Sequence, residues 1–342
     1  INRLTIRTKL LLILLIPISG LLFFSIASVL EKSRAMREME SVETLASLVV
    51  KIGETVHELQ KERGLTAGFL AGKGVEIPPE LVAQRNASDQ RIFGLEQLTQ
   101  SLSKRHSALV QALGDPVRRL HILKAQQRLR IDAFEMDAGK TIALYNDSIA
   151  PLLDVSLQLP LLGSDREISR LAFAYASLLY LKEHTGRERA MLNNVFTAGR
   201  FSADQRRDFA ANLAVQEHYL HLFHAFASND QRALFAAQMN QPTLNELEHL
   251  KQYALTRADK EILEQDPANW FRLATVKVDA LHVVEKQLAN DLLSLSLEIK
   301  RKTQMVMLAF AVLAALAILA ALGYAVLLIR NILAQLGGEP CY

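Results

Sequence analysis

The apolar residues between positions 42 and 59 recur at alternating intervals of three and four. They are Val42, Leu45, Val49, Ile52, Val56 and Leu59. This spacing places them on one face of an α-helix, as is typical of a helix packed in a bundle. The same count next reaches Arg63, where the pattern requires an apolar side chain. Because an unpaired charge at a packed position is costly, the segment predicts a helical bundle with a polar site inside it.

A second segment repeats this pattern further along the chain. The same intervals run through Ile168, Leu171, Tyr175 and Leu178, and then reach Lys182, Thr185 and Arg189. The two arginines lie in similar phrases, Glu62-Arg-Gly and Glu188-Arg-Ala. Two like charges brought together need an anion between them, so we interpret Arg63 and Arg189 as a pair that faces across the packed helices and binds an anion.

The composition supports an all-α protein and excludes several functions. Glycine and proline are few, and Leu, Ala, Gln, Glu and Arg dominate the 342 residues. The formal charge of +3 does not suggest a nucleic-acid partner. The single cysteine, Cys341, leaves no disulfide framework or cysteine metal site. Since the sequence also has no phosphate-binding glycine loop and no nucleophile with a partnered base, we expect neither a cofactor nor an enzyme.

Two uncharged runs, residues 10–30 and 305–329, are long enough to cross a bilayer. Basic residues in front of the first run favour a start inside the cell. The sequence therefore predicts a multi-pass protein of the bacterial inner membrane. In this prediction residues 1–9 are cytoplasmic, residues 31–304 form a periplasmic domain, and residues 330–342 begin a cytoplasmic linker.

The periplasmic segment is predicted to form two four-helix bundles. The turn signals place lobe one at about residues 31–160 together with a return helix at 267–304, and lobe two at about residues 161–266. Gly114-Asp-Pro is expected to be a turn between helices. Later helices are expected to begin at Ser164 or Asp165, at Ser202 with Gln205, and at Asp266-Pro.

Several residues could support the anion. The hydroxyl groups of Thr66 and Thr185 lie one seam step from the arginines, and Lys182 offers a further charge. The alternative is an internal ion pair of either arginine with a carboxylate, for which the candidates are Glu62, Glu183, Glu188 and Asp89. The residue pattern alone supports the two interpretations about equally. The presence of a similar phrase in both segments favours a ligand.

His218, His221 and His224 offer a different interpretation, a metal or haem site. Side chains spaced by exactly three residues drift around a helix, and no acidic cluster completes a tetrahedral set. Half-buried or solvated histidines are therefore expected here, and no metal ligands are assigned.

Separated motifs resemble the nitrate- and nitrite-sensing (NIT) domain of bacterial receptors. They are Leu59-Gln-Lys-Glu-Arg-Gly-Leu-Thr-Ala-Gly-Phe-Leu, Gln84-Arg-Asn-Ala-Ser-Asp, Leu181-Lys-Glu-His-Thr-Gly-Arg-Glu-Arg-Ala and Trp270-Phe, and the resemblance covers roughly residues 49–292. The tail Leu336-Gly-Gly-Glu-Pro-Cys-Tyr looks like the start of a HAMP linker, although Ala334 stands where many such linkers have proline.

The resemblance implies two four-helix bundles that hold nitrate or nitrite through arginines. Carried onto this sequence, it gives Arg63 and Arg189, with Gly64 in the first phrase and Arg187 as the nearest rival in the second. It also implies a homodimeric methyl-accepting chemotaxis receptor that signals across the inner membrane to an adaptor and kinase. The alternatives are a membrane-anchored metal or haem protein and a ligand-free structural spacer.

Overall fold

The computed structural model describes residues 6–72, 76–102, 107–162, 165–257 and 263–335, and leaves out the side chains of most residues from 6 to 42. All regular elements within these ranges are helical. The expectation of an all-α protein is therefore confirmed.

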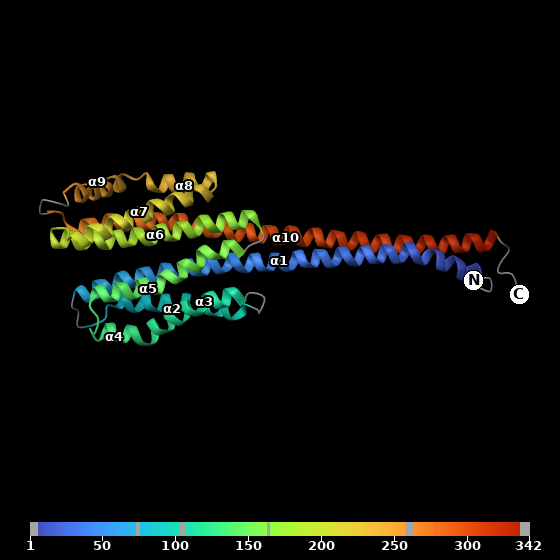
Figure 1. The fold of residues 1–342 in the computed structure, drawn as a ribbon, viewed down its shortest axis with the longest axis horizontal. Helices are drawn as coiled ribbons and strands as arrows, with labels where there is room; N and C mark the ends of the chain where they lie inside the picture. Colours follow the sequence, from blue (N-terminus) through green and yellow to red (C-terminus); the bar gives the residue numbers. More distant parts are fainter. Residues whose placement is uncertain (1–5, 73–75, 103–106, 163–164, 258–262, 336–342) are drawn as a thin grey trace. The chain divides into compact units, whose positions relative to one another are not determined.

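The first bundle is built from the amino-terminal half of the chain (Figure 1). Its helices are α1 (Ile6–Ala71), α2 (Pro79–Ser101), α3 (Ser107–Ile122), α4 (Arg128–Asp132) and α5 (Ala138–Gln158), with a π-helical turn at Leu123–Gln127 between α3 and α4. The apolar seam of α1 is buried as predicted, with Ile52, Val56 and Leu59 at 0% exposure. These side chains form the α1 face of the core.

The second bundle follows a short 3-10 helix at Leu159–Leu162. It consists of α6 (Arg166–Ala198), α7 (Ala203–Phe226), α8 (Asn229–Met239), α9 (Pro242–Arg257) and the first part of α10 (Pro267–Gln335). Its core gathers around Trp270, which is fully buried against Phe196 with a ring distance of 5.7 Å. Leu273 and Ala274 of α10 belong to the same core. The start of the return helix therefore packs in the second bundle, although the sequence analysis assigned that helix to lobe one.

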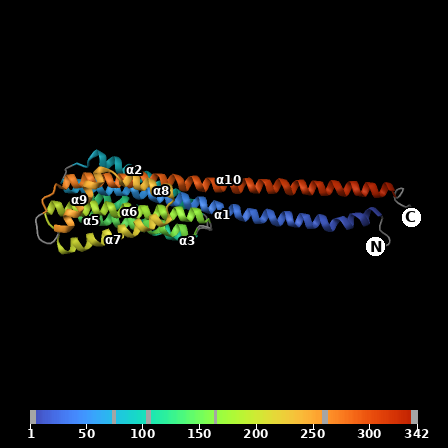
Figure 2. The ribbon, with the colours of Figure 1, turned by 90° about the horizontal axis from the view of Figure 1, so that it is seen from above.

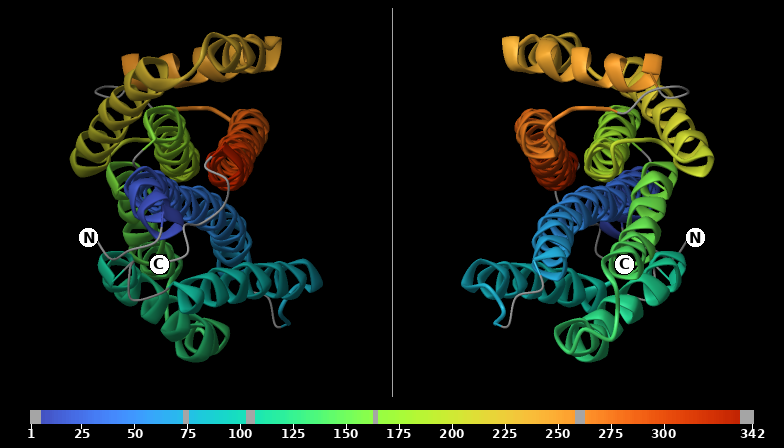
Figure 3. Two further views of the ribbon diagram at one scale, coloured as in Figure 1. Left: turned by 90° about the vertical axis from the view of Figure 1, so that its right-hand side faces the viewer. Right: turned by 90° about the vertical axis from the view of Figure 1, so that its left-hand side faces the viewer.

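Figure 3 shows the two bundles end on, with α6 and the orange part of α10 in one group and the green and light-blue helices in the other. The expected helix starts are present. Asp165 caps α6, Ser202 and Gln205 form a reciprocal capping box on α7, and α10 begins at Pro267. Local sequence therefore fixes where these helices begin.

The expected turn at Gly114-Asp-Pro is not present, because α3 continues through it and carries Pro116 in its interior. The chain instead turns after Asp132, where Phe134 adopts the left-handed conformation with φ of 55°. Phe134 packs on Phe69 with a ring distance of 5.2 Å, so tertiary packing rather than local turn chemistry sets this turn.

The chain divides into two compact units, Thr44–Leu295 and a second unit made of Ile1–Glu43 and Ser296–Tyr342. The second unit contains the outer parts of α1 and α10, the two long helices in Figure 2, and an ion pair of 2.6 Å between Glu43 and Lys300. In the described part of the chain one helix, α10, is long and apolar enough to cross a membrane. Two such spans were predicted, and the side chains of the first, at 10–30, lie mostly outside the described residues.

Candidate functional site

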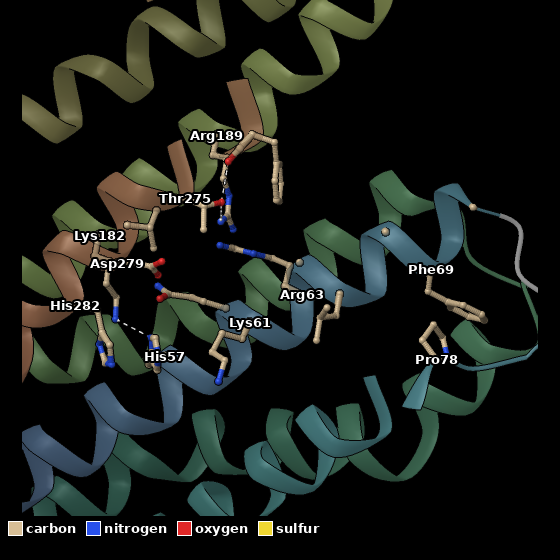
Figure 4. A pocket seen from close by; sticks show the side chains of 18 of the residues that line it. His57, Lys61, Arg63, Phe69, Pro78, Lys182, Arg189, Thr275, Asp279 and His282 are labelled. Carbon is tan, nitrogen blue, oxygen red and sulfur yellow. Dashed lines mark hydrogen bonds between the residues drawn. The ribbon is translucent and has the colours of Figure 1, made fainter. Parts of the chain in front are cut away.

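A cavity of about 780 Å³ lies within the Thr44–Leu295 unit, between α1, α6 and α10. Arg63 of α1 and Arg189 of α6 both line it, and both also line a neighbouring cavity of about 480 Å³. Figure 4 shows their guanidinium groups pointing toward each other. The structure thus brings together the two arginines that the sequence pattern paired.

Arg63 is held by a buried carboxylate. Its Nη1 donates to Glu183 Oε1 at 2.7 Å and its Nη2 to Glu183 Oε2 at 3.1 Å. Nη1 also donates to Asn146 Oδ1 of α5. The side chain of Arg63 is 9% exposed and that of Glu183 0%. The alternative interpretation of the sequence, an internal ion pair, is therefore realised for this arginine.

Glu183 accepts hydrogen bonds from more than one cationic side chain. Besides Arg63, Arg187 Nε donates to its Oε1 at 2.8 Å and Gln60 Nε2 to its Oε2 at 2.9 Å. Burial alone would raise the pKa of Glu183, but the charges and hydrogen bonds of Arg63 and Arg187 outweigh it and lower the pKa to about 2. Glu183 is thus a fixed anion beside the cavity.

Arg189 has a different environment. Its Nη1 donates to Thr275 Oγ1 at 2.9 Å, and its guanidinium lies over the ring of Phe271 at 4.5 Å from the centroid. Trp270 Nε1 donates to the backbone carbonyl of Arg189 at 2.9 Å and so fixes this part of α6. Among the described residues no carboxylate forms an ion pair with Arg189. Burial, and then the nearby charge of Arg63, lower its pKa, while the charge of Asp279 acts in the opposite direction.

Two glycines give the guanidinium groups their room. A Cβ at Gly186 would lie 3.4 Å from Arg63 Nη2, and one at Gly64 would lie 3.8 Å from Arg189 Nη2. Side chains larger than alanine at these positions would displace the arginines. Gly64, predicted as a supporting residue, therefore lies at the arginine pair.

Two other predicted residues, Thr66 and Thr185, line neither of the two cavities, whereas Arg187 lines the smaller one. Thr66 is buried in the first bundle near the hydroxyl of Tyr145 at 3.4 Å. Thr185 donates to the backbone of Leu181 at 2.8 Å in the second bundle. Arg187 binds Glu183 and lines the smaller cavity. The two threonines lie three and four residues from the arginines, which is about one helical turn, so their side chains lie beyond the site.

Lys182 lines the larger cavity, but its ammonium group is already engaged. It donates to Glu285 Oε2, and His57 Nδ1 lies 3.4 Å from it. Burial would raise the pKa of Glu285, but the charge of Lys182 and the hydrogen bond from His282 lower it to about 2. Burial, followed by the charge of Lys182, lowers the pKa of His57 to about 3, so this ring is neutral.

His57, His282 and Glu285 bring ligand atoms within 4.8 Å of one another. The two imidazole rings are nearly parallel, with an angle of 8° and centroids 3.6 Å apart. An ion in the plane of one ring would lie well outside the plane of the other, so both rings cannot direct a lone pair at one metal. Lys182 also occupies the carboxylate. The geometry therefore does not favour a metal here.

The histidine row of α7 has other contacts. His218 packs edge-on against Tyr219 at 5.3 Å, and His224 packs on Phe235 at 5.5 Å, while His221 is exposed. Among the described residues these histidines do not belong to the group of His57, His282 and Glu285, whose spacing would suit a metal ion. The expected solvated or half-buried positions are observed.

Sequence reasoning missed four residues near the arginines, namely Gln60, Asn146, Phe271 and Thr275. Phe271 belongs to the Trp270-Phe phrase and Thr275 lies one helical turn beyond it, so both could have been found from that phrase. The other two carry no periodic signal.

The comparison with protein families decides the identity of this domain. The model for nitrate and nitrite sensing, NIT, matches residues 54–293. The chain belongs to the NIT family. This confirms the resemblance seen in the sequence, and all the residues of the arginine site lie within the matched range.

Two relatives of the NIT chain were found. It is 29% identical over 262 residues to a nitrate regulatory protein of Klebsiella oxytoca, which covers 75% of this chain and 65% of the relative. The chain thus spans slightly less than two thirds of that relative. The structure of the NasR transcription antiterminator has the same fold, with a TM-score of 0.69 and 23% identity over 91% of this chain and 87% of that chain.

These relatives overturn the predicted output of the NIT chain. They are a nitrate regulatory protein and a transcription antiterminator, so the predicted inner-membrane chemoreceptor with its chemotaxis adaptor and kinase is wrong. The exclusion of nucleic acid as a partner is withdrawn for the same reason. The HAMP-like tail lies largely outside the described residues. A sensory fold defines the input site and does not fix the output that it controls, so the inference from fold to chemotaxis failed.

Proposed function

We propose that this NIT domain binds nitrate or nitrite between Arg63 and Arg189, and that the bound anion is the signal of a regulatory protein. The observation that carries the proposal is the guanidinium of Arg189, which forms no ion pair with a carboxylate of the described residues and is directed into a cavity beside Arg63. A planar monoanion matches the fork of donors on a guanidinium group. The function is sensing and not catalysis.

The ligand-free spacer remains the second candidate for one specific reason. Arg63 is fully compensated by Glu183, as a purely structural arginine would be. Arg189 argues against the spacer, because a structural role gives no reason to place a second guanidinium beside the first without a carboxylate. The two arginines therefore discriminate between the candidates.

Binding would couple the two bundles. Arg63 belongs to α1 of the first bundle, while Arg189 of α6 contacts Thr275 of α10 in the second. An anion held by both arginines favours the arrangement in which α1, α6 and α10 approach, and a coupling free energy of about 1–3 kcal/mol is enough to transmit a signal.

Isothermal titration of the purified chain with nitrate, nitrite and chloride tests the proposal. We expect saturable binding of nitrate or nitrite, a rise in melting temperature with ligand concentration, and no saturable binding of chloride. Arg189→Gln should abolish the binding. Absence of binding by both oxyanions, with a folded chain, would favour the spacer.

A further inference from the structure

The cavity beside the arginines is much larger than the ligand of the proposed function. Its volume is about 780 Å³. Nitrate has four heavy atoms and takes the space of roughly two water molecules, or about 60 Å³. Cavities of several hundred Å³ are typical of sites for organic molecules. The anion alone therefore leaves most of the space unused.

The chemistry of the cavity changes along α1. Arg63, Arg189 and Lys182 line one part. Leu65, Gly68, Phe69 and Pro78 also line the cavity, and the first three follow Arg63 along α1. Figure 4 shows Phe69 and Pro78 on the side of Arg63 away from Lys182. From Arg63 to Gly72, the lining glycine directly after α1, the chain rises about 14 Å at the helical rise per residue. A ligand that fills the cavity needs an anionic head and an apolar body.

The ion pairs around the cavity indicate where that head binds. Four cations line the cavity, and three of them are paired with carboxylates: Arg63 with Glu183, Lys182 with Glu285, and Lys61 with Glu58 at 3.1 Å. Arg189 is the lining cation for which the described residues provide no such partner. The two carboxylates that line the cavity, Glu76 and Asp279, are exposed to solvent, and the charge of Asp279 acts on Arg189 without an ion pair. A monoanionic head at Arg189 would therefore provide the ion-pair partner that this cation lacks among the described residues.

We propose that this cavity also binds an aromatic monocarboxylate, with the carboxylate at Arg189 and Arg63 and the ring against Leu65 and Phe69. The proposal rests on the anion site of the proposed function. A carboxylate presents the same planar pair of oxygens as nitrate. Phe271, which lies beneath Arg189 and lines the cavity, adds a second aromatic face.

Gly68 provides a variant that separates the two ligands. No atom lies within 4 Å of a Cβ built at this position, and the residue lines the apolar part of the cavity. We expect leucine there to occupy the space for the ring, and it raises the helix propensity of α1. Gly94 of α2 has equally open surroundings and lies outside the cavity lining, so Gly94→Leu is the matched control.

The test is titration of the full chain with benzoate, with benzyl alcohol as the uncharged analogue, and competition between benzoate and nitrate. We expect benzoate to bind and to displace nitrate, and benzyl alcohol not to bind. Gly68→Leu should weaken benzoate at least tenfold and change nitrate affinity less than twofold, whereas Gly94→Leu should change neither. Circular dichroism melts confirm that both variants fold.

The outcomes separate the two proposals. Nitrate binding without benzoate binding overturns the carboxylate site and leaves the nitrate site standing. Benzoate that binds without displacing nitrate, or that binds Gly68→Leu as well as wild type, also overturns it. If neither anion binds a folded chain, the proposed function fails and the carboxylate site fails with it.

Discussion

The two Glu-Arg phrases occupy corresponding places in the two bundles, but they are compensated differently. Glu62 accepts two hydrogen bonds of 2.8 Å from Arg128 and one of 2.6 Å from Tyr145. Glu188 accepts one of 2.9 Å from Gln216 and has Lys277 at 3.4 Å, and its Oε1 has no partner among the described residues. Both carboxylate oxygens of Glu62 therefore have partners, whereas one carboxylate oxygen of Glu188 has none among the described residues.

The arginines that follow these glutamates differ in the same sense. Arg63 is bound by Glu183 and Asn146, whereas Arg189 is bound by one hydroxyl and one aromatic ring. Buried charges that are fully paired stabilise a fixed structure, and a cation without its partner is a site for a ligand. The comparison therefore separates a structural half of the site from a receptive half.

The largest expected effect is the loss of stability when Glu62 loses its partner Arg128. Arg128→Met removes the bidentate partner of the buried Glu62 and should lower the free energy of unfolding by about 3–5 kcal/mol, because a buried charge is left uncompensated. The matched change in the second bundle, Lys277→Met, removes a longer and partly exposed contact and should cost about 1 kcal/mol. Urea unfolding followed by circular dichroism measures both. Equal losses of unfolding free energy would show that Glu62 and Glu188 are equally well compensated.

The arginines themselves give the next effect. Arg63→Gln and Arg189→Gln should each weaken nitrate by at least ~100-fold, or about 2.7 kcal/mol. Their effects on stability should differ. Arg63→Gln removes a buried ion pair and should cost about 2 kcal/mol, while Arg189→Gln should change stability by less than about 0.5 kcal/mol. Nitrate titration and urea unfolding of both variants check this, and a large loss of stability in Arg189→Gln would contradict the receptive role.

Glu183 should compete with the ligand for Arg63. Glu183→Gln removes a fixed negative charge beside the site and should tighten nitrate binding about tenfold. Glu188→Gln is the matched control, since it makes the same substitution on the same helix at a carboxylate that contacts Gln216 and Lys277 instead of Arg63. Titration calorimetry of both variants measures the change. Weaker binding in Glu183→Gln would assign Glu183 the role of positioning Arg63.

The smallest effect concerns His57, where the two bundles also meet. Its pKa is about 3 in the fold against an ordinary value of 6.5. The unfolded chain therefore binds a proton that the folded chain does not, and stability is lost as the pH falls below 6.5. Between pH 6.5 and 5.5 this group should remove about 1 kcal/mol.

The measurement is the free energy of unfolding of wild type and His57→Gln at both pH values. The variant should lose about 1 kcal/mol less than wild type over this interval, whereas His221→Gln on the exposed face of α7 should lose as much as wild type. The groups that face His57 are Lys182, His282, Glu285 and Glu58. Below pH 4.5, protonation of Glu183 and Glu285, whose pKa values are lowered to about 2, should add a further loss. Equal slopes in wild type and His57→Gln would contradict this assignment.

Much of the fold could be predicted from the sequence, because the seam of α1 and the capping residues at Asp165 and Ser202 are local signals. The start of the return helix packs in the second bundle around Trp270, and no local pattern encodes that packing. The facing arginines followed from seam spacing. Their different compensation did not, because Glu183 and Asn146 come from other helices and their approach depends on tertiary structure.

A crystal structure of the chain grown with nitrate would test the central claim most directly. We predict planar density between the two arginines, within hydrogen-bond distance of the guanidinium nitrogens of both Arg63 and Arg189. Nitrate bound elsewhere in the chain, with Arg189 still contacting only Thr275 and Phe271, would contradict the account.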